Sequence, residues 1–237
     1  MAANTKKYYD ETASKYDDLH GGDKNLEHLQ ALEKSFSFLD GKIHSVLDVG
    51  CGTGRTLNWY AQRNPKLELN GIDPSEGLLQ IAQNRLPQAK FSVGQGETLP
   101  FDDASIDLVV ATGIMHHVDH PKRVIQEISR VARKAVLISD HNDFACGSMI
   151  VRKLRLWLHA TGLLSLCQFV KQGFRKQGYS QDDGWWYPYS IFNDYTTIAG
   201  THSHVYVIPT RPANAQAGNL LLSLSHAAIL VMKPQSS

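Results

Sequence analysis

Cysteine is scarce in this chain. Its 237 residues contain three cysteines, Cys51, Cys146 and Cys167, which lie far apart in the sequence. An odd number of widely spaced cysteines argues against a disulfide framework, and the lack of a Cys-x-x-Cys pair argues against structural zinc. Reduced thiols are typical of the cytosol, so we expect a cytoplasmic protein.

Long apolar runs are also missing. The sequence has no stretch of about 18 apolar residues, the minimum for a membrane-spanning helix. The basic residues Lys6 and Lys7 are not followed by the apolar segment of a secretory signal. The formal net charge of +1 gives no indication of a nucleic-acid partner, and a hydrophobic content of 42% is enough for one sizeable core.

Acidic residues are absent from residues 144–181. Basic residues surround the apolar run 154–170 in this segment: Arg152, Lys153, Arg155, Lys171, Arg175 and Lys176. An amphipathic helix with basic flanks is typical of peripheral contact with an anionic membrane, or of an anionic ligand. An ordinary packed helix with a solvated basic rim explains the same pattern, and both interpretations stay open.

Short apolar runs alternate with helical segments along the chain. The predicted strands are residues 43–49, 67–72, 90–93, 106–111, 135–139, 204–209 and 227–232, and the predicted helices between them include residues 55–64, 75–85 and 121–133. Strands without polar alternation, joined by helices, form parallel sheets that are covered on both faces. We therefore expect a Rossmann-like α/β fold with seven mostly parallel strands and an antiparallel terminal hairpin.

The same pattern predicts a single domain over residues 1–237. Its expected parts are an N-terminal helical cap (1–40), a cofactor-binding core (43–140), a helical and aromatic cover (144–200) and the final strands (204–233). Ligands of open α/β sheets bind at the carboxyl ends of the strands. The cover begins just after the carboxyl end of the fifth strand. We expect the cover to lie over the substrate.

A glycine-rich turn follows the first predicted strand. Residues 46–54 read Val-Leu-Asp-Val-Gly-Cys-Gly-Thr-Gly, which places Gly50, Gly52 and Gly54 between a strand and a helix. Glycine lets the chain turn tightly and lets a ligand approach the backbone, where the amides of the helix N-terminus point into the site. Nicotinamide and flavin enzymes use a similar turn, so the glycines alone do not identify the ligand.

Two acidic residues narrow the choice of ligand for this turn. Asp48 precedes the first glycine by two positions, where a negative charge disfavours a pyrophosphate and favours a cationic amino group, directly or through water. Asp73 ends the second strand 19 residues after Gly54, where its carboxylate can accept hydrogen bonds from two ribose hydroxyls. An isolated aspartate at such a position caps a helix about as often. Together the two acids favour an adenosine that carries a cationic amino acid.

Residues 94–101 (Gly-Gln-Gly-Glu-Thr-Leu-Pro-Phe) and residues 106–110 (Ile-Asp-Leu-Val-Val) complete a recognisable pattern. With the glycine turn, they make the chain similar to class I S-adenosylmethionine-dependent methyltransferases, in particular to the group of quinone and small-molecule methyltransferases. The resemblance covers residues 43–140 well, extends weakly to the segment from Tyr8 to Asp17, and says little about residues 144–225.

The resemblance implies S-adenosylmethionine as the cofactor. It places Gln95 where the family has an acid that contacts the adenine amino group, and the amide oxygen of Gln95 can still accept a hydrogen bond there. It places Ala111 and Thr112 at the methionine end and lets Tyr16 close over the cofactor. The expected cofactor-binding residues are Tyr16, Asp48, Gly50, Cys51, Gly52, Gly54, Asp73, Pro74, Gln95, Gly96, Glu97, Ala111 and Thr112.

Histidines cluster after the fourth strand, in the sequence His116-His117-Val118-Asp119-His120. Metal binding is one reading, but the sequence shows no second cluster of ligands, so we expect no metal. A histidine pKa near neutrality suits a general base, and His116 and then His141 follow strand ends where ligands bind. Histidines that orient loops or face solvent explain the pattern equally well.

Aromatic residues gather within the predicted cover. Trp185, Trp186, Tyr187 and Tyr189 would wall a substrate pocket, or would equally well hold the added helices on the core. With the basic residues of this segment, they suggest a substrate with an aromatic or lipid-like body and an anionic part.

The predicted activity is in-line transfer of a methyl group to an oxygen, nitrogen or carbon atom of a small molecule. Residues 111–114 read Ala-Thr-Gly-Ile rather than the Asn-Pro-Pro-Tyr type of sequence of adenine methylation, which argues against a nucleic-acid substrate. Two alternatives remain: a nicotinamide-dependent Rossmann oxidoreductase, and a catalytically silent protein that binds S-adenosylmethionine and regulates a partner.

Overall fold

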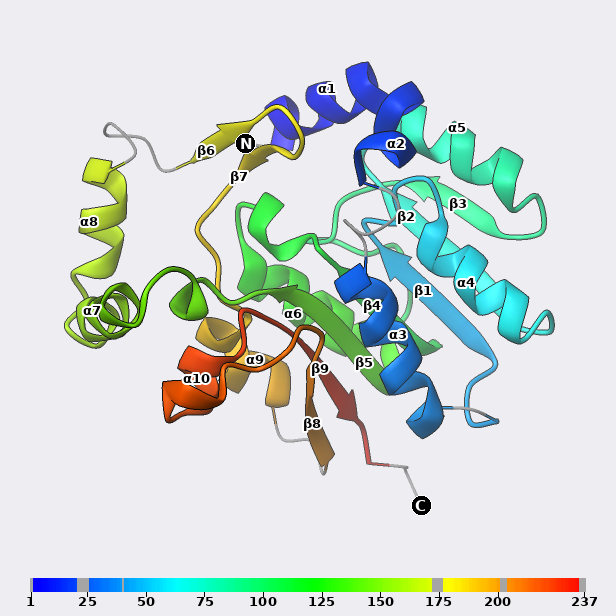
Figure 1. The fold of residues 1–237 in the computed structure, drawn as a ribbon. Coiled ribbons are helices and arrows are strands. Elements are labelled where there is room, and N and C mark those ends of the chain that lie inside the picture. Colours follow the sequence, from blue (N-terminus) through cyan, green and yellow to red (C-terminus); the bar gives the residue numbers. More distant parts are fainter. Residues whose placement is uncertain (1, 21–25, 40, 172–176, 201–203, 235–237) are drawn as a thin grey trace.

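The computed structural model describes residues 2–20, 26–39, 41–171, 177–200 and 204–234. Seven strands form one sheet, in the order β3-β2-β1-β4-β5-β9-β8 (Figure 1). Their bounds are β1 (Ser45–Val49), β2 (Glu68–Asp73), β3 (Lys90–Val93), β4 (Ile106–Thr112), β5 (Ala132–His141), β8 (His204–Pro209) and β9 (His226–Met232). The predicted strands are therefore confirmed, with shifts of up to three residues at their ends.

The pairing of the strands explains the expected topology. Strands β1 to β5 pair in parallel with their neighbours, whereas β9 pairs antiparallel with β5 and with β8. Helices cover both faces of this sheet, so β4 and most of β5 are buried on both sides. The seven-stranded, mostly parallel fold with an antiparallel terminal hairpin is confirmed.

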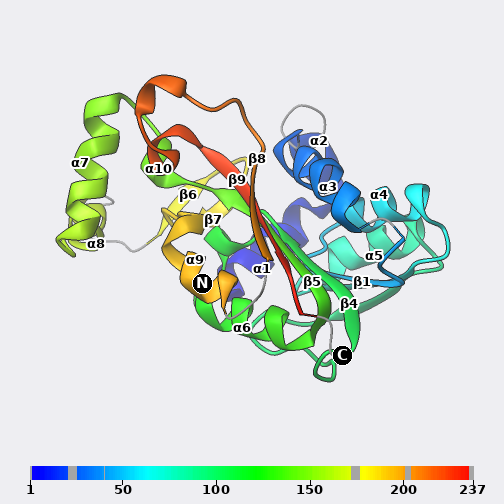
Figure 2. The same cartoon turned by 90° about the horizontal axis from the view of Figure 1, so that it is seen from below.

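Amphipathic helices form the two outer layers (Figure 2). One face of the sheet is covered by α3 (Leu26–Leu39) and α4 (Arg55–Arg63), and the other by α6 (Pro121–Val131) and α9 (Tyr195–Ala199). Helix α6 places Val124, Ile125, Ile128 and Val131 on its buried side, the spacing of a helix that packs on one stripe. Helix α5 (Glu76–Arg85) begins where predicted, with Ser75 as its N-cap.

Short elements lie above the carboxyl edge of the sheet. Helices α1 (Ala2–Thr12) and α2 (Tyr16–His20), joined by the 3-10 turn η1 (Ala13–Lys15), lie beside a small hairpin, β6 (Gly178–Ser180) and β7 (Gly184–Trp186). The turn η3 (Met115–His117) follows β4 directly. These elements bring the N-terminus, the end of β4 and the segment after β5 to one place.

The hairpin corrects the sequence prediction, which expected no strand in residues 144–200. Each strand has only three residues, so neither shows a pattern that sequence reasoning can detect. Gly184 has a φ of +68°, and a Cβ there would lie 2.6 Å from the Tyr8 ring, so glycine lets the hairpin approach α1 closely.

The other elements that the structure describes in the segment after β5 are helical, as expected. This segment contains η4 (Asp143–Ala145), α7 (Met149–Ala160), α8 (Leu164–Lys171) and η5 (Ile191–Asp194), while η6 (Ala215–Ala217) and α10 (Leu220–Ser223) connect β8 to β9. Among the described residues, none of the helices is long and apolar enough to cross a membrane.

Candidate active site

The glycine-rich turn has the backbone conformation that its glycines permit. Gly50, Gly52 and Gly54 all have positive φ angles, of 73°, 52° and 76°. A Cβ on Gly50 would lie 2.5 Å from the Ile114 side chain, and a Cβ on Gly52 would contact Tyr16. The turn therefore presents bare backbone towards β4 and the N-terminal helices, and α4 begins directly after it.

A first cavity lies between this turn and the ends of β2, β3 and β4. Its wall includes Thr5, Tyr9, Tyr16, Gly50, Asp73, Pro74, Gly94, Gln95, Gly96, Glu97, Thr112 and His117. Asp73 accepts hydrogen bonds from the backbone N–H groups of Gly52 (2.9 Å) and Ser75 (2.8 Å). Burial outweighs these bonds and raises the pKa of Asp73 to about 6.

Asp48 lies beneath the turn rather than in the wall of the cavity. Its side chain is buried, and among the described residues its Oδ1 atom has no hydrogen-bond partner. Burial raises the pKa of Asp48 well above its usual range, and the nearby carboxylate of Asp73 adds to the effect. A buried acceptor without a partner is costly unless a ligand or water satisfies it.

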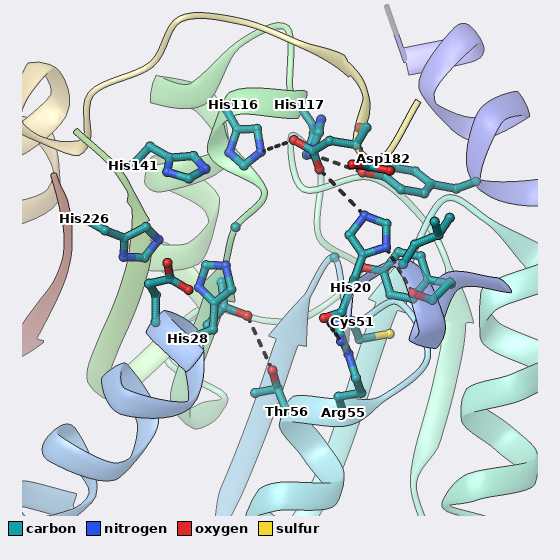
Figure 3. A pocket seen from close by; sticks show the side chains of 18 of the residues that line it. His20, His28, Cys51, Arg55, Thr56, His116, His117, His141, Asp182 and His226 are labelled. Atoms are coloured by element: carbon teal, nitrogen blue, oxygen red, sulfur yellow. Dashed lines mark hydrogen bonds and ion pairs between the residues drawn. The ribbon is translucent and has the colours of Figure 1, made fainter. Parts of the chain in front are cut away.

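A second cavity adjoins the first and is rich in histidine (Figure 3). The two share Tyr9, Tyr16, Gly50, Thr112, Gly113 and His117. Six histidines from different elements line the second cavity, which we call the histidine pocket: His20, His28, His116, His117, His141 and His226. Rings of neighbouring histidines lie close together, for example 4.0 Å between the centroids of His116 and His117.

His116 lies between two carboxylates. Its Nδ1 is 2.8 Å from Asp140 Oδ1, and its Nε2 is 3.4 Å from Asp183 Oδ2. Burial alone would lower the pKa of His116, but Asp140 and Asp183 outweigh burial and raise the pKa to about 10. Burial likewise opposes the charge of Asp140, and its pKa is nevertheless held below its usual range by His116. His116 is therefore a buried imidazolium at neutral pH.

The opposite side of the histidine pocket holds neutral imidazoles. Burial lowers the pKa of His28 to about 4 and that of His226 to about 2. Each ring is held by a hydroxyl, since His28 Nδ1 is 3.3 Å from Ser139 Oγ and His226 Nδ1 is 2.6 Å from Thr210 Oγ1. The pocket thus combines one cationic histidine with neutral ones a few ångströms away.

Asp183 enters the site from the turn of the β6–β7 hairpin. Its Oδ1 atom is 3.4 Å from His117 Nε2 and 3.8 Å from His20 Nε2. Sequence reasoning missed both Asp183 and His20 as members of the site. The one signal was that the acid-free segment ends at Asp182, directly before Asp183.

Comparison with known proteins matches part of the chain to methyltransferases. Residues 47–138 match the family described as a methyltransferase domain. The chain is 34% identical over 143 residues to the demethylmenaquinone methyltransferase of Thermotoga maritima, covering 56% of this chain and 61% of that protein. It is 29% identical over 115 residues to a ubiquinone/menaquinone biosynthesis C-methyltransferase of Campylobacter jejuni, covering 46% and 48%. The chain thus spans about half the length of these curated relatives.

Solved structures share the fold over nearly the whole chain. A methyltransferase from Thermotoga maritima has a TM-score of 0.62 at 16% identity, covering 97% of this chain and 100% of that one. Residues 47–138 thus match the methyltransferase domain family, and the chain as a whole shares the fold of these solved methyltransferases. A methyltransferase from Aquifex aeolicus also matches, with a TM-score of 0.56 at 18% identity and coverage of 94% and 98%. At these identities the likeness of the two structures shows the fold.

The first cavity fits S-adenosylmethionine, the cofactor that the match to methyltransferases implies. The positive φ angles leave room for a ligand against the turn, and Asp73 faces the cavity where a ribose would lie. Beneath the same turn lies the buried Oδ1 atom of Asp48, an acceptor that has no hydrogen-bond partner among the described residues. Acceptors on this side suit a ligand with hydroxyl and ammonium groups better than they suit a pyrophosphate.

The expected cofactor-binding residues fall into three groups. Those in the wall of the first cavity are Tyr16, Gly50, Asp73, Pro74, Gln95, Gly96, Glu97 and Thr112. Cys51 lines the histidine pocket instead, and Gly52 and Gly54 shape the turn. Ala111 and Asp48 are buried in the strands and line neither cavity.

The predicted aromatic cluster lies outside the histidine pocket. Tyr189 is buried and donates to Asp194, Tyr187 donates to Asp119 (2.6 Å), and Trp186 lines a separate groove beside α7 and α8. The Trp185 ring packs on Tyr179. The backbone carbonyl of Trp185 is the group that reaches the site, 2.7 Å from His117 Nδ1. The cluster therefore holds the cover together, and Tyr9 and Tyr16 supply the aromatic walls of the pocket.

Proposed function

We propose that this protein transfers a methyl group from S-adenosylmethionine to a small molecule seated in the histidine pocket. One observation carries the proposal: the cavity that fits the cofactor opens onto the histidine pocket through shared walls. The curated relatives are methyltransferases by name, and their names refer to quinone biosynthesis. Proximity of two bound reactants is the main contribution that a protein makes to such a transfer.

The proposed cofactor contacts follow from the first cavity. Asp73 accepts from the ribose hydroxyls, Gln95 and Gly96 contact the adenine, and Asp48 compensates the ammonium group of the methionine. When bound, S-adenosylmethionine would supply the methyl group of its sulfonium; the acceptor would form a bond to that methyl in line as the carbon–sulfur bond breaks and S-adenosylhomocysteine leaves. Tyr16 covers both cavities, and its ring rests on the turn beside Gly52. The chain thus orients the cofactor and excludes water.

The histidine pocket suits a compact, polar acceptor. Its wall is made mainly of imidazoles, hydroxyls and charged groups, and Leu19 is its only aliphatic side chain among the described residues. The flat rings of Tyr9 and Tyr16 fit an aromatic body. Arg55 and Arg211 lie at the wall and would face an anionic part, although each already has a carboxylate partner, Asp17 and Glu27. A long lipid-like body finds little support in this wall.

A base is needed only if the acceptor must lose a proton. We place His141 before His116 in this role, which reverses the order expected from the sequence. Both nitrogens of His116 face carboxylates, so its ring has no lone pair to offer. His141 lines the pocket, and its ring makes no hydrogen bond to the part of the chain that the structure describes.

The test begins with the cofactor. S-Adenosylhomocysteine should raise the melting temperature of the purified protein, whereas NAD should not. Labelled S-adenosylmethionine should then transfer its methyl group to a small molecule from a cell extract. Stabilisation by NAD alone would favour the oxidoreductase. Binding without transfer to any acceptor would favour the silent regulator.

A second proposal concerns the α7–α8 hairpin, which projects from the body of the protein (Figures 1 and 2). We propose that this hairpin touches anionic membranes, because Ile150 and Trp157 are 81% and 57% exposed beside the exposed Lys153. Arg152 and Arg155 bind backbone carbonyls within the protein, which reduces the free charge. Arg175 and Lys176 lie outside the described residues.

Co-sedimentation with liposomes tests the membrane proposal. Binding should require anionic lipid and should weaken with salt. Trp157→Ala should reduce it, whereas Trp59→Phe, a change in the core, should not. Absence of binding at low salt would overturn this proposal and would leave the methyltransferase proposal unaffected.

A further inference from the structure

Three imidazoles converge on one carboxylate in the histidine pocket. The Nε2 atoms of His116, His117 and His20 lie 3.4, 3.4 and 3.8 Å from the oxygens of Asp183. The ligand atoms of His116, His117 and Asp183 all lie within 4.8 Å of one another. The four residues come from η3, from α2 and from the β6–β7 turn, so only the folded chain brings them together.

A hydrogen-bond acceptor fixes the tautomer of each ring. Nδ1 of His116 is 2.8 Å from the Asp140 carboxylate. Nδ1 of His117 is 2.7 Å from the carbonyl oxygen of Trp185, and Nδ1 of His20 is 3.1 Å from that of Tyr16. Each Nδ1 therefore carries the proton and donates it. The Nε2 atom of each ring then faces Asp183, and it becomes a ligand when it carries no proton, an arrangement typical of metal-binding histidines with their supporting partners.

The spacing matches that of metal ligands. In tetrahedral sites with bonds of about 2.0–2.1 Å, neighbouring ligand atoms lie about 3.3–3.4 Å apart. His117 Nε2 lies at this distance from Oδ1 of Asp183 and His116 Nε2 from Oδ2, while His20 Nε2 lies slightly further from Oδ1, at 3.8 Å. His20 Nε2 is also buried without a hydrogen-bond partner among the described residues, which is an independent sign that a ligand belongs there.

We propose that His20, His116, His117 and Asp183 bind a divalent transition-metal ion of the zinc type. Three imidazole nitrogens and one carboxylate oxygen favour zinc, cobalt, nickel or iron(II) over magnesium and calcium, which prefer oxygen ligands. The proposal departs from the sequence expectation of no metal, which relied on the lack of a second cluster of ligands in the sequence.

Two other occupants compete with the ion. A proton on His116 Nε2 is the first, and binding of the ion displaces it. The hydroxyl of Tyr9 is the second, 3.1 Å from His117 Nε2. The same hydroxyl lies 3.4 Å from the backbone carbonyl of Asp183, so it keeps a hydrogen-bond acceptor when the ion takes the histidine.

The ion would occupy the wall that the two cavities share, since His117 lines both. It would also join the N-terminal helices, the end of β4 and the β6–β7 hairpin. An oxygen or nitrogen atom of the acceptor could then complete its coordination. The metal proposal does not depend on the methyltransferase proposal, because binding can be measured without cofactor or acceptor.

The experiment uses the full chain after treatment with a chelator. Cobalt(II) serves as a spectroscopic probe and zinc(II) as a competitor. We expect one equivalent of cobalt to bind with the intense visible absorption of a tetrahedral site, and zinc to displace it. Asp183→Asn and His20→Gln should each weaken binding by at least about 10–100-fold, the effect seen even for the loss of an orienting partner.

Two control variants make the result specific. Asp182→Asn removes the same charge from the neighbouring residue of the same wall, and His28→Gln removes an imidazole from the opposite side of the pocket. Both should bind cobalt as the unmodified chain does. Circular dichroism establishes whether each variant is folded. If His20→Gln does not fold, the cobalt binding of Asp183→Asn alone tests the proposal.

Three results would overturn the proposal. The first is no uptake of cobalt by the unmodified chain at stoichiometric concentration, and the second is unchanged binding by Asp183→Asn. A loss in Asp182→Asn equal to that in Asp183→Asn would mean that only acidic charge matters. A folded chain that binds S-adenosylhomocysteine but no metal would overturn the metal proposal and support the proposed function.

Discussion

At the scale of single residues, Asp73 offers the sharpest test of the cofactor site. Asp73→Ala should weaken binding of S-adenosylhomocysteine, because up to two charge-assisted hydrogen bonds worth about 1.5–3 kcal/mol each are lost. Isothermal titration calorimetry measures the change. Asp102→Ala, which removes an exposed acid beyond the cavity, is the control and should bind normally. Equal affinities in the two variants would contradict the role of Asp73.

The pKa of Asp73 gives a second prediction at this scale. Burial raises this pKa to about 6 in the cofactor-free protein, so the side chain is a carboxylate above pH 6 and a neutral acid below it. Because the carboxylate is the stronger acceptor, affinity for S-adenosylhomocysteine should fall as the pH is lowered through 6. The Asp73→Ala variant should lack this step. A wild-type affinity that is constant from pH 7.5 to about 5 would contradict the prediction.

At the scale of elements, the ion pair between Glu127 and Arg130 on helix α6 stabilises the contact of this helix with the loop before β4. Arg130 binds Glu127 and also donates to the carbonyls of Leu99 and Phe101. The hydrogen bonds from Arg130 lower the pKa of Glu127 to about 2. The folded pKa lies below the unfolded value, so the stabilisation is complete above about pH 4.5 and is lost as the pH falls towards 2.

Glu127→Gln should therefore lower the free energy of unfolding at pH 7 by about 1–2 kcal/mol after allowance for solvent screening. Urea denaturation at pH 7 and at pH 3 measures it. The difference between the variant and the unmodified chain should shrink at the lower pH. Glu76→Gln, at the exposed start of α5, is the control. A difference that does not change with pH would contradict the electrostatic explanation.

The β6–β7 hairpin is the element that carries Asp183. Trp186 packs closely over Gly178, where an added Cβ would lie 2.6 Å from the indole ring. Trp186→Ala should loosen the hairpin and weaken cobalt binding, and should reduce methyl transfer far more than binding of S-adenosylhomocysteine. Hydrogen exchange of residues 178–186 reports the loosening. Tyr179→Ala, whose ring is 54% exposed on the same hairpin, should have a smaller effect. Equal losses of cofactor and metal binding would mean that Trp186 supports the whole core.

At the scale of the whole molecule, the N-terminal helices and the hairpin form one roof over the two cavities. Tyr8 donates to the carbonyl of Gln181, Asp10 accepts from Ser75 (2.6 Å), and Thr53 donates to Asp17 (2.7 Å). S-Adenosylhomocysteine should therefore slow hydrogen exchange in α1, α2 and the hairpin together. Exchange in the projecting α7–α8 hairpin should not change. Protection of the glycine turn alone would show that the roof does not respond to the cofactor.

Much of the fold could be predicted from the sequence, because its signals are local. Apolar runs of strand length and the glycine turn are read from neighbouring residues, and the structure shows β1 to β5 and the terminal hairpin where expected. Ser75 caps α5 as its sequence position predicts. Asp73, Gln95 and Gly96 line the cavity for the same reason, since Asp73 ends β2 and Gln95 and Gly96 lie in the turn after β3.

Only the tertiary structure decided the composition of the histidine pocket. His20, His28 and His226 lie in segments without a motif, and Asp183 lies in a hairpin too short to be recognised. The sequence left two readings of the aromatic cluster open, a pocket wall or packing of the cover, and the fold places the cluster outside the histidine pocket. The physical reason is that backbone propensity and hydrophobic periodicity act over a few residues, whereas ligand convergence depends on the packing of elements more than 60 residues apart in the chain. The sequence by itself determined the sheet, the turn and the class of cofactor; packing decided which side chains face the acceptor.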